Sequence, residues 1–246
     1  MLSVNTNTGA MVALQYLNKT NSDLQETQSH INSGLKVSGP KDNGAVYAIA
    51  QNMRGNVAGY AAVSDSLNRG VSTVDVAISA GQSISDLLNE LKGKALAAAD
   101  ASLDTASRNA LNADFTALRD QITTIVQNAS FNGTNLVDGT TANIQALASA
   151  DGSKKITAAA QTLKLSGSIV TVKSTSTIST TGKASTMVST INSSIQNVNA
   201  SLAKLASSSK KFSIQSSFVS KLVDTLNAGI GNLVDADMAE IGRAHV

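Results

Sequence analysis

The sequence predicts a mainly α-helical protein with a small β-hairpin region, built as an elongated antiparallel helical bundle or coiled-coil rod. Two observations predict this fold class. Apolar residues recur at alternating spacings of three and four near both ends of the chain, which is the pattern of helices that pack on other helices. Between these ends lies one stretch rich in Thr, Ser, Val and Gly, which is typical of β-hairpins.

The first helix is expected between Ala10 and Leu35. Its seam contains apolar residues with polar interruptions, namely Ala10, Leu14, Leu17, Asn21, Leu24, Gln28, Ile31 and Leu35. Gly34 suits a C-cap, and the segment from Val37 to Asn43, which contains the only proline, is expected to be a turn.

A long second helix and a shorter third helix should form a hairpin. Asp42 or Asn43 can cap the second helix, and residues 99–105 interrupt the pattern before the third. The second stripe comprises Val46, Ile49, Met53, Val57, Tyr60, Val63, Leu67, Val71, Val74, Ile78, Ile84, Leu88, Leu91 and Ala95. The third comprises Leu111, Phe115, Leu118, Ile122, Ile125 and Ala129.

The stretch from Leu136 to Gly182 is expected to contain β-hairpins. Short alternating runs cover residues 155–157 and 162–172, and Asp151-Gly152 is a turn signal. Residues 174–181 are expected to be an exposed loop, which O-linked sugars could modify.

The last helix has the most regular pattern of the chain. Its seam comprises Val188, Ile191, Ile195, Val198, Leu202, Leu205, Ser209, Phe212, Ser216, Val219, Val223, Leu226, Ile230 and Leu233. At about 1.5 Å per residue, this helix would be roughly 65–70 Å long, which exceeds the thickness of a compact single core.

The composition fits close helix packing better than a catalytic pocket. Of the 246 residues, 15% are charged and 3% aromatic, and the net charge is +2. Scattered charges give no basic patch for nucleic acid, and few aromatic side chains are present to line a deep pocket. The absence of cysteine excludes disulfides and thiolate chemistry. No apolar run approaches membrane-spanning length, so no membrane insertion is expected.

Several short motifs resemble those of one family, the bacterial flagellins. Residues 5–17 resemble its N-terminal helix, residues 31–36 (Ile-Asn-Ser-Gly-Leu-Lys) its first turn, and residues 41–50 the start of its second helix. Residues 131–136 (Phe-Asn-Gly-Thr-Asn-Leu) and 232–239 resemble its hairpin entry and its C-terminal signature. The similarity is greatest to the short flagellins of alphaproteobacteria.

The resemblance implies a structural subunit that needs no cofactor, is not an enzyme and serves motility. Such subunits are secreted unfolded through the flagellar type III export apparatus and polymerise beneath a cap into the extracellular filament. The implied partners are other flagellin subunits, filament cap and hook-junction proteins, and an export chaperone.

The resemblance also implies a division into domains. Residues 1–42 would be an N-terminal polymerisation helix, residues 43–135 the core rod helices, and residues 136–183 the β-hairpin region. Residues 184–239 would be the C-terminal rod helix. Residues 240–246 do not continue the family pattern, so we expect a non-native tail in place of a C-terminal helix. Without that helix, self-assembly and chaperone binding should be weak.

The candidate functional residues are contacts rather than catalysts. Expected subunit contacts are Leu14, Leu17, Leu24, Ile31, Asp42, Asn43, Asp235 and Asp237. Some flagellins dock on an innate Toll-like receptor of animals through an Arg and a Leu, where this chain has Glu90 and Lys94, so weak receptor activation is expected. The two histidines, His30 and His245, lack the partners of a zinc site and are expected to be solvated.

Two other functions remain open from the sequence. A hook-filament junction protein has similar terminal helices, and a surface adhesin or glycan-binding protein on the same scaffold would use residues 136–182. The motif at residues 131–136 favours flagellin over the first, and the few aromatic residues argue against the second.

Overall fold

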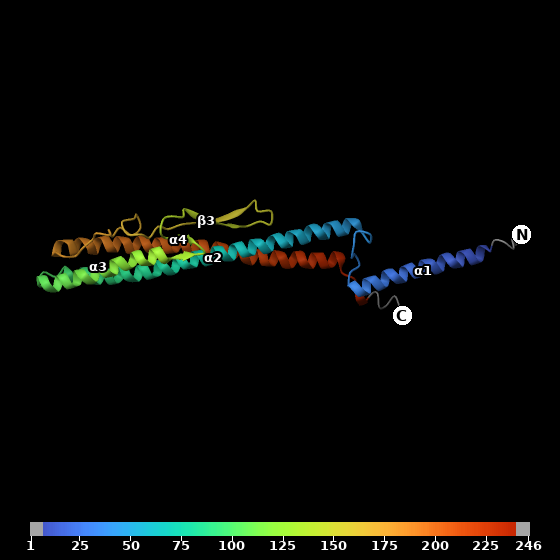
Figure 1. The fold of residues 1–246 in the computed structure, drawn as a ribbon, viewed down its shortest axis with the longest axis horizontal. Helices are drawn as coiled ribbons and strands as arrows, with labels where there is room; N and C mark the ends of the chain where they lie inside the picture. The colour runs from blue at the N-terminus through green and yellow to red at the C-terminus, as the bar shows by residue number, and fades with distance from the viewer. Residues whose placement is uncertain (1–6, 240–246) are drawn as a thin grey trace. The chain divides into compact units, whose positions relative to one another are not determined.

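The computed structural model describes residues 7–239, and within them it contains four helices and four short strands (Figure 1). The helices are α1 (Thr8–Ser33), α2 (Gly44–Ala98), α3 (Thr105–Asn128) and α4 (Thr181–Val234). The strands are β1 (Ser130–Phe131), β2 (Thr134–Asn135), β3 (Asn143–Leu147) and β4 (Lys155–Ala159). The predicted mainly α class with a small β region is therefore confirmed. The expected tail at residues 240–246, and the weak assembly inferred from it, lie outside the described residues.

The chain divides into two compact units, and helices α2 and α4 contribute to both. The larger unit is Gly59–Ser220, and the smaller combines Met1–Ala58 with Lys221–Val246. Each unit is described separately below.

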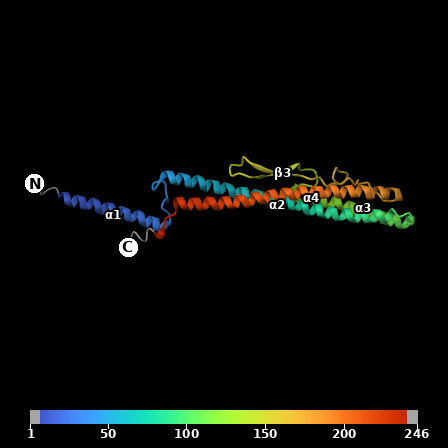
Figure 2. The same ribbon diagram turned by 180° about the vertical axis from the view of Figure 1, so that it is seen from behind.

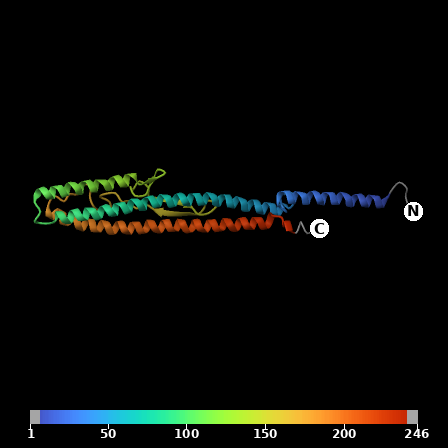
Figure 3. The same ribbon diagram turned by 90° about the horizontal axis from the view of Figure 1, so that it is seen from below.

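In the larger unit, α4 lies antiparallel to α2 (Figures 1 and 3). The Ser209 hydroxyl of α4 donates to the Asp75 carboxylate of α2 at 3.0 Å, and the Phe212 ring lies against Gly70. Helix α3 folds back along the C-terminal half of α2 (Figure 2), where Lys94 Nζ is 2.6 Å from an oxygen of Asp114. The antiparallel helical packing expected from the sequence is therefore present in this unit.

Buried residues of the larger unit follow the heptad pattern closely. Along α2 they alternate spacings of four and three through Val63, Leu67, Gly70, Val74, Ala77, Gly81, Ile84, Leu88, Leu91, Ala95 and Ala98. Along α4 they recur every seven residues through Ala184, Ile191, Val198, Leu205, Phe212 and Val219. Such spacing is typical of helices that pack knobs into holes.

The predicted stripe of α2 is not buried at every position. Val71 and Ile78 are only half-buried, and Ile49 is exposed. The seam instead uses Gly70, Ala77 and Gly81, because small residues let the Phe212 ring and the Leu202 side chain approach the α2 backbone. A pattern search for large apolar residues overlooks such positions.

Two hairpins connect α3 to the last helix. Strands β1 and β2 are joined by Asn132 and Gly133, both at positive φ, as a two-residue type I′ turn requires. Strands β3 and β4 pair antiparallel, and the predicted turn at Asp151-Gly152 is confirmed. The second hairpin packs on the helices, since the Leu147 N–H donates to the Ser66 hydroxyl at 3.0 Å.

Residues 162–172, predicted as a strand run, form no strand in the structure. The alternation itself reflects burial, since Leu163, Leu165, Val170 and Val172 are all buried. The backbone groups, however, bond to other partners than a neighbouring strand. The Leu163 N–H donates to the Val137 carbonyl at 2.7 Å, and the Thr171 N–H donates to the Ser194 hydroxyl of α4 at 3.0 Å.

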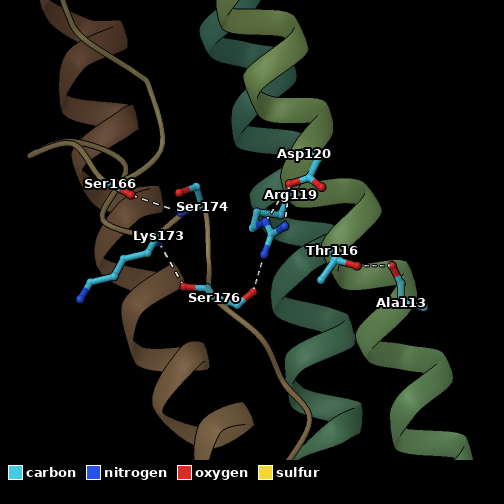
Figure 4. Close-up of polar contacts among 8 residues, drawn as sticks. All are labelled: Ala113, Thr116, Arg119, Asp120, Ser166, Lys173, Ser174 and Ser176. Carbon is cyan, nitrogen blue, oxygen red and sulfur yellow. Dashed lines mark hydrogen bonds and ion pairs between the residues drawn. The ribbon is translucent and has the colours of Figure 1, made fainter.

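Residues 174–181 form a loop up to the start of α4, as predicted, but this loop is only partly exposed, because residues 176–178 pack against α3. Ile178 is fully buried, and its N–H donates to the Asn112 side-chain oxygen at 2.7 Å. Arg119 of α3 donates to the Ser176 carbonyl at 2.7 Å and pairs with Asp120 (Figure 4). The last helix then begins at Thr181 rather than near residue 184.

The smaller unit holds a short core beneath the turn that follows α1. Val37, Ala50, Ile230 and Val234 are buried there, and six partly buried apolar residues pack around them: Leu35, Val46, Tyr47, Met53, Val57 and Leu233. Gly34 ends α1 at φ 70°, in the left-handed conformation expected of a glycine C-cap.

Candidate assembly surfaces

Helix α1 presents an apolar face that nothing in the described chain covers. None of its residues is buried, although the predicted contacts Leu14, Leu17, Leu24 and Ile31 are large apolar side chains that are 43–58% exposed. Met11, Val12 and Tyr16 are exposed as well. Large apolar side chains left exposed along one helix in this way indicate an interaction surface.

The next predicted contacts, Asp42 and Asn43, have roles inside the chain. The Asn43 side chain accepts the Val46 N–H at 3.0 Å and so caps α2. The Asp42 carboxylate accepts the Ser38 N–H and hydroxyl, both at 2.8 Å, and the Gly39 N–H at 2.9 Å. These bonds, the Ser38 hydroxyl first, hold the pKa of Asp42 below its usual value and keep the turn folded around an ionised carboxylate.

The end of α4 is joined to the same turn. The Lys36 N–H donates to the Val234 carbonyl at 2.8 Å, the Ala236 N–H donates to the Gly34 carbonyl at 2.9 Å, and Leu35 forms a bridge with Asp235. The Asp237 carboxylate accepts the Ala239 N–H at 2.9 Å. Asp235 and Asp237, the two predicted acidic contacts, therefore lie beside this turn and are exposed. Their contact with another subunit stays a prediction.

The two residues expected to weaken receptor docking, Glu90 and Lys94, differ in their surroundings. Glu90 is exposed on α2, whereas Lys94 forms the ion pair with Asp114 of α3. That ion pair links α2 to α3, so Lys94 has a role in helix packing that the sequence did not predict.

Among the described residues, no group of three or more His, Asp or Glu side chains could hold a metal ion. His30 was expected to be solvated, but its side chain is half-buried. Its Nε2 atom is shielded from water and has no hydrogen-bond partner in the described chain. His245 lies outside the described residues. The described helices include none that is long and apolar enough to cross a membrane.

Three exposed apolar residues of the larger unit were missed by the sequence reading. Leu96 on α2 is 62% exposed, and Ile214 and Phe218 on α4 are 60% and 54% exposed. All three lie off the heptad seam, so the spacing of apolar residues could not have identified them as exposed surface.

Comparison with known proteins gives one consistent result. Residues 4–142 match the family model described as the bacterial flagellin N-terminal helical region. The chain is 50% and 51% identical to flagellins FljM and FljN of Caulobacter vibrioides, over 97% of this chain and 86% of each relative. A flagellin of Brucella melitensis is 31% identical over 97% of this chain and 87% of its own length.

Among solved structures, a crystal structure of Bacillus cereus flagellin aligns with 73% of this chain and 93% of its own, with 19% identity and a TM-score of 0.48.

Proposed function

The chain belongs to the bacterial flagellin family, and from that premise we propose how it works as a subunit. It is a structural protein that polymerises into the bacterial flagellar filament used for motility. We propose that its work is entirely mechanical, with neighbouring copies held together by apolar faces that are left uncovered in the single chain.

The uncovered face of α1 is the observation that carries this proposal. Burying apolar surface contributes about 25 cal/mol per Å², and a heptad seam buries its surface best against another helix. Leu14, Leu17, Leu24 and Ile31 would therefore pack on helices of neighbouring copies. Asp42, Asn43, Asp235 and Asp237 would form polar contacts around the turn at the end of this seam.

The wider set of partners follows from the same premise. Export through the flagellar apparatus, delivery by a chaperone, and contact with cap and hook-junction proteins would bring the subunit to the extracellular filament. Glu90 would place a negative charge, and Lys94 a lysine already paired with Asp114, where the receptor contacts are expected. A cell reporter carrying the receptor should therefore respond weakly, and a response equal to that of an enterobacterial flagellin would contradict this part of the proposal.

The hook-junction and adhesin functions are not favoured, because the family model and the curated relatives above are all flagellins. The test is to express the chain in a bacterium whose own flagellin genes are deleted. Electron microscopy with gold-labelled antibody should show the label along the whole length of any extracellular filaments that form. Label confined to the hook-filament junction, or found only on the cell body, would favour one of the two alternatives.

A further inference from the structure

The last part of the larger unit, from residue 152 to residue 220, carries positive charge only. It contains eight lysines and no aspartate, glutamate or arginine. In the structure this stretch includes strand β4, the segment that follows it, and most of helix α4. None of its lysines forms an ion pair with any described residue. The combined field of such a surface attracts anions and raises their concentration near it.

A shallow pocket lies within this positively charged stretch, between helix α4 and the residues around the end of β4. Its volume is about 380 Å³. Helix α4 contributes Lys204, Ser207, Ser208 and Lys211, and the segment after β4 contributes Gln161. No acidic side chain of the described chain lines the pocket. The pocket is therefore positively charged, and no carboxylate of the described chain neutralises it.

The two lysines of the pocket lie on the same side of α4. Lys204 and Lys211 are seven residues apart, which is about two helical turns and roughly 10.5 Å along the helix axis. Ser207 and Ser208 lie between them, about one turn from each lysine. Lysine has a long, flexible side chain, so both ammonium groups can turn toward one anion beside these serines.

Gln161 distinguishes this pocket from a simple patch of surface charge. The residue is only 9% exposed, and its backbone N–H donates to the Leu136 carbonyl at 2.9 Å. Its side-chain Nε2 donates one N–H to the Ala160 carbonyl at 2.8 Å, and the second N–H has no partner among the described residues. Buried polar groups nearly always have hydrogen-bond partners. A free donor in the lining of a positively charged pocket therefore favours a ligand with acceptor oxygens.

The two serines of the pocket differ in what they can offer to such a ligand. The Ser208 hydroxyl already donates to the Lys204 carbonyl at 3.0 Å, so its proton is used. The Ser207 hydroxyl has no hydrogen bond within the described chain and can still donate. The pocket thus holds two cationic and two neutral donors. A phosphate or sulfate group has several acceptor oxygens on one atom and can use all four donors.

We propose that this pocket binds a phosphate or sulfate group. The ammonium groups of Lys204 and Lys211 would neutralise its charge, and the Gln161 N–H and the Ser207 hydroxyl would donate to its remaining oxygens. Because the bound group would join Gln161 to α4, it should hold the segment after β4 on that helix. A free anion and a phosphate group carried by a larger molecule present the same oxygens, and two probes distinguish them. This binding goes beyond filament assembly and does not depend on it.

The test measures the melting temperature of the purified full chain, as a monomer at pH 7, while sodium phosphate is added. Relative to sodium chloride of equal ionic strength, phosphate should raise the melting temperature by roughly 3 °C or more at about ten times its dissociation constant. The increase should then level off as the site fills, whereas general stabilisation by phosphate as a salt keeps growing. The side-chain amide signal of Gln161 in a nuclear magnetic resonance spectrum should shift along the same curve.

Matched variants show whether the pocket causes this increase. Lys204→Gln with Lys211→Gln should lose the saturating increase, and so should Gln161→Leu, which keeps a buried side chain but has no N–H donor. Lys173→Gln with Lys183→Gln removes the same charge at exposed positions outside the pocket and should keep the increase. Each variant is compared with its own melting temperature in chloride, so a change in folding stability alone does not imitate the result.

Glucose 1-phosphate is the second probe and identifies the source of the phosphate group. If it binds more tightly than inorganic phosphate, and the Lys204→Gln, Lys211→Gln variant loses this binding, the pocket takes a phosphate carried by a larger molecule. Equal or weaker binding assigns the pocket to the free anion. A saturating increase with neither probe, or an equal loss in the Lys173→Gln, Lys183→Gln control, would overturn the proposed site. Either of these results would leave the role in the filament unchanged.

Discussion

At the scale of single residues, Arg119 shows how a charged group can occupy a heptad position. It is buried between Phe115 and Ile122 on α3, where the sequence pattern led us to expect the neighbouring Leu118. Its guanidinium group reaches the Ser176 carbonyl and the Asp120 carboxylate (Figure 4). The aliphatic part of the Arg119 side chain packs in the heptad seam, while its guanidinium group holds the segment around Ser176, which leads into α4.

Replacing Arg119 with Met should destabilise the larger unit by about 1.5–3 kcal/mol. Met fills most of the volume of the aliphatic part of Arg119, but the Ser176 carbonyl loses its charged hydrogen-bond donor. Urea unfolding followed by circular dichroism measures the change. The matched variant Asp120→Asn leaves the bond to Ser176 in place and should cost less, so equal losses in the two variants would argue against this role for Arg119.

Asp151 predicts a pH dependence of the β3–β4 turn. Its carboxylate accepts bonds from the Ser149 hydroxyl and from the Ser153 N–H and hydroxyl, which lower its pKa from 3.8 to about 2. A carboxyl whose pKa is lower in the folded state stabilises that state above its unfolded pKa and loses this effect as the pH falls. The turn should therefore loosen between about pH 4 and pH 2.

Nuclear magnetic resonance of the Gly152 amide would follow this transition. Its chemical shift should change in that acidic window. In the variant Asp151→Asn the shift should stay constant there, because no carboxyl remains to titrate in the turn. A titration of the same size in both chains would show that the turn does not depend on Asp151.

At the scale of the elements, helices were predicted well and the segments between them less well. Heptad spacing located all four helices because a helix that packs on another helix repeats its contacts every seven residues. Residues 162–172 alternate between buried and exposed as a strand does, yet their N–H groups bond to a loop and to α4. Alternation in a sequence reports burial, and only the structure shows whether a neighbouring strand is present to pair.

Glycine contacts between elements give a sharper prediction. At Gly59 a Cβ atom would lie 2.8 Å from the Ala150 Cβ and 2.9 Å from its carbonyl oxygen. Gly59→Ala should therefore displace the tip of the β3–β4 hairpin and cost about 1–3 kcal/mol, despite the better helix propensity of alanine. Gly93→Ala, where a Cβ atom would meet nothing within 4 Å, is the matched control and should stabilise the monomer by about 0.5–1 kcal/mol. Equal melting temperatures for the two variants would contradict the close contact at Gly59.

At the scale of the whole molecule, the two units differ in how many of their helical residues are buried. The larger unit has an uninterrupted seam, whereas α1 of the smaller unit buries no residue. Stability within a protein follows such differences, and poorly packed segments open at little cost. The sequence indicated the unpaired seam of α1. It did not indicate the exposed faces around Leu96 and Phe218, since single apolar residues off the seam look ordinary until their exposure is known.

Hydrogen exchange should show the difference between the units. In the monomer, amides of α1 should exchange rapidly, and those of α2 between Val63 and Ala98 should be among the slowest. In filaments, the α1 amides should become protected. Equal protection of α1 in the two states, measured by mass spectrometry on the same preparation, would show that assembly does not cover this helix.

Cysteine labelling tests most directly the central claim that assembly buries the apolar face of α1. The chain has no cysteine, so the variant Leu17→Cys carries a single reporter at a position that is 57% exposed in the free subunit. A maleimide reagent should label this thiol rapidly in monomers and at least about tenfold more slowly in filaments, because buried groups are shielded from reagents in solution. Labelling at the same rate in monomers and filaments would contradict the account.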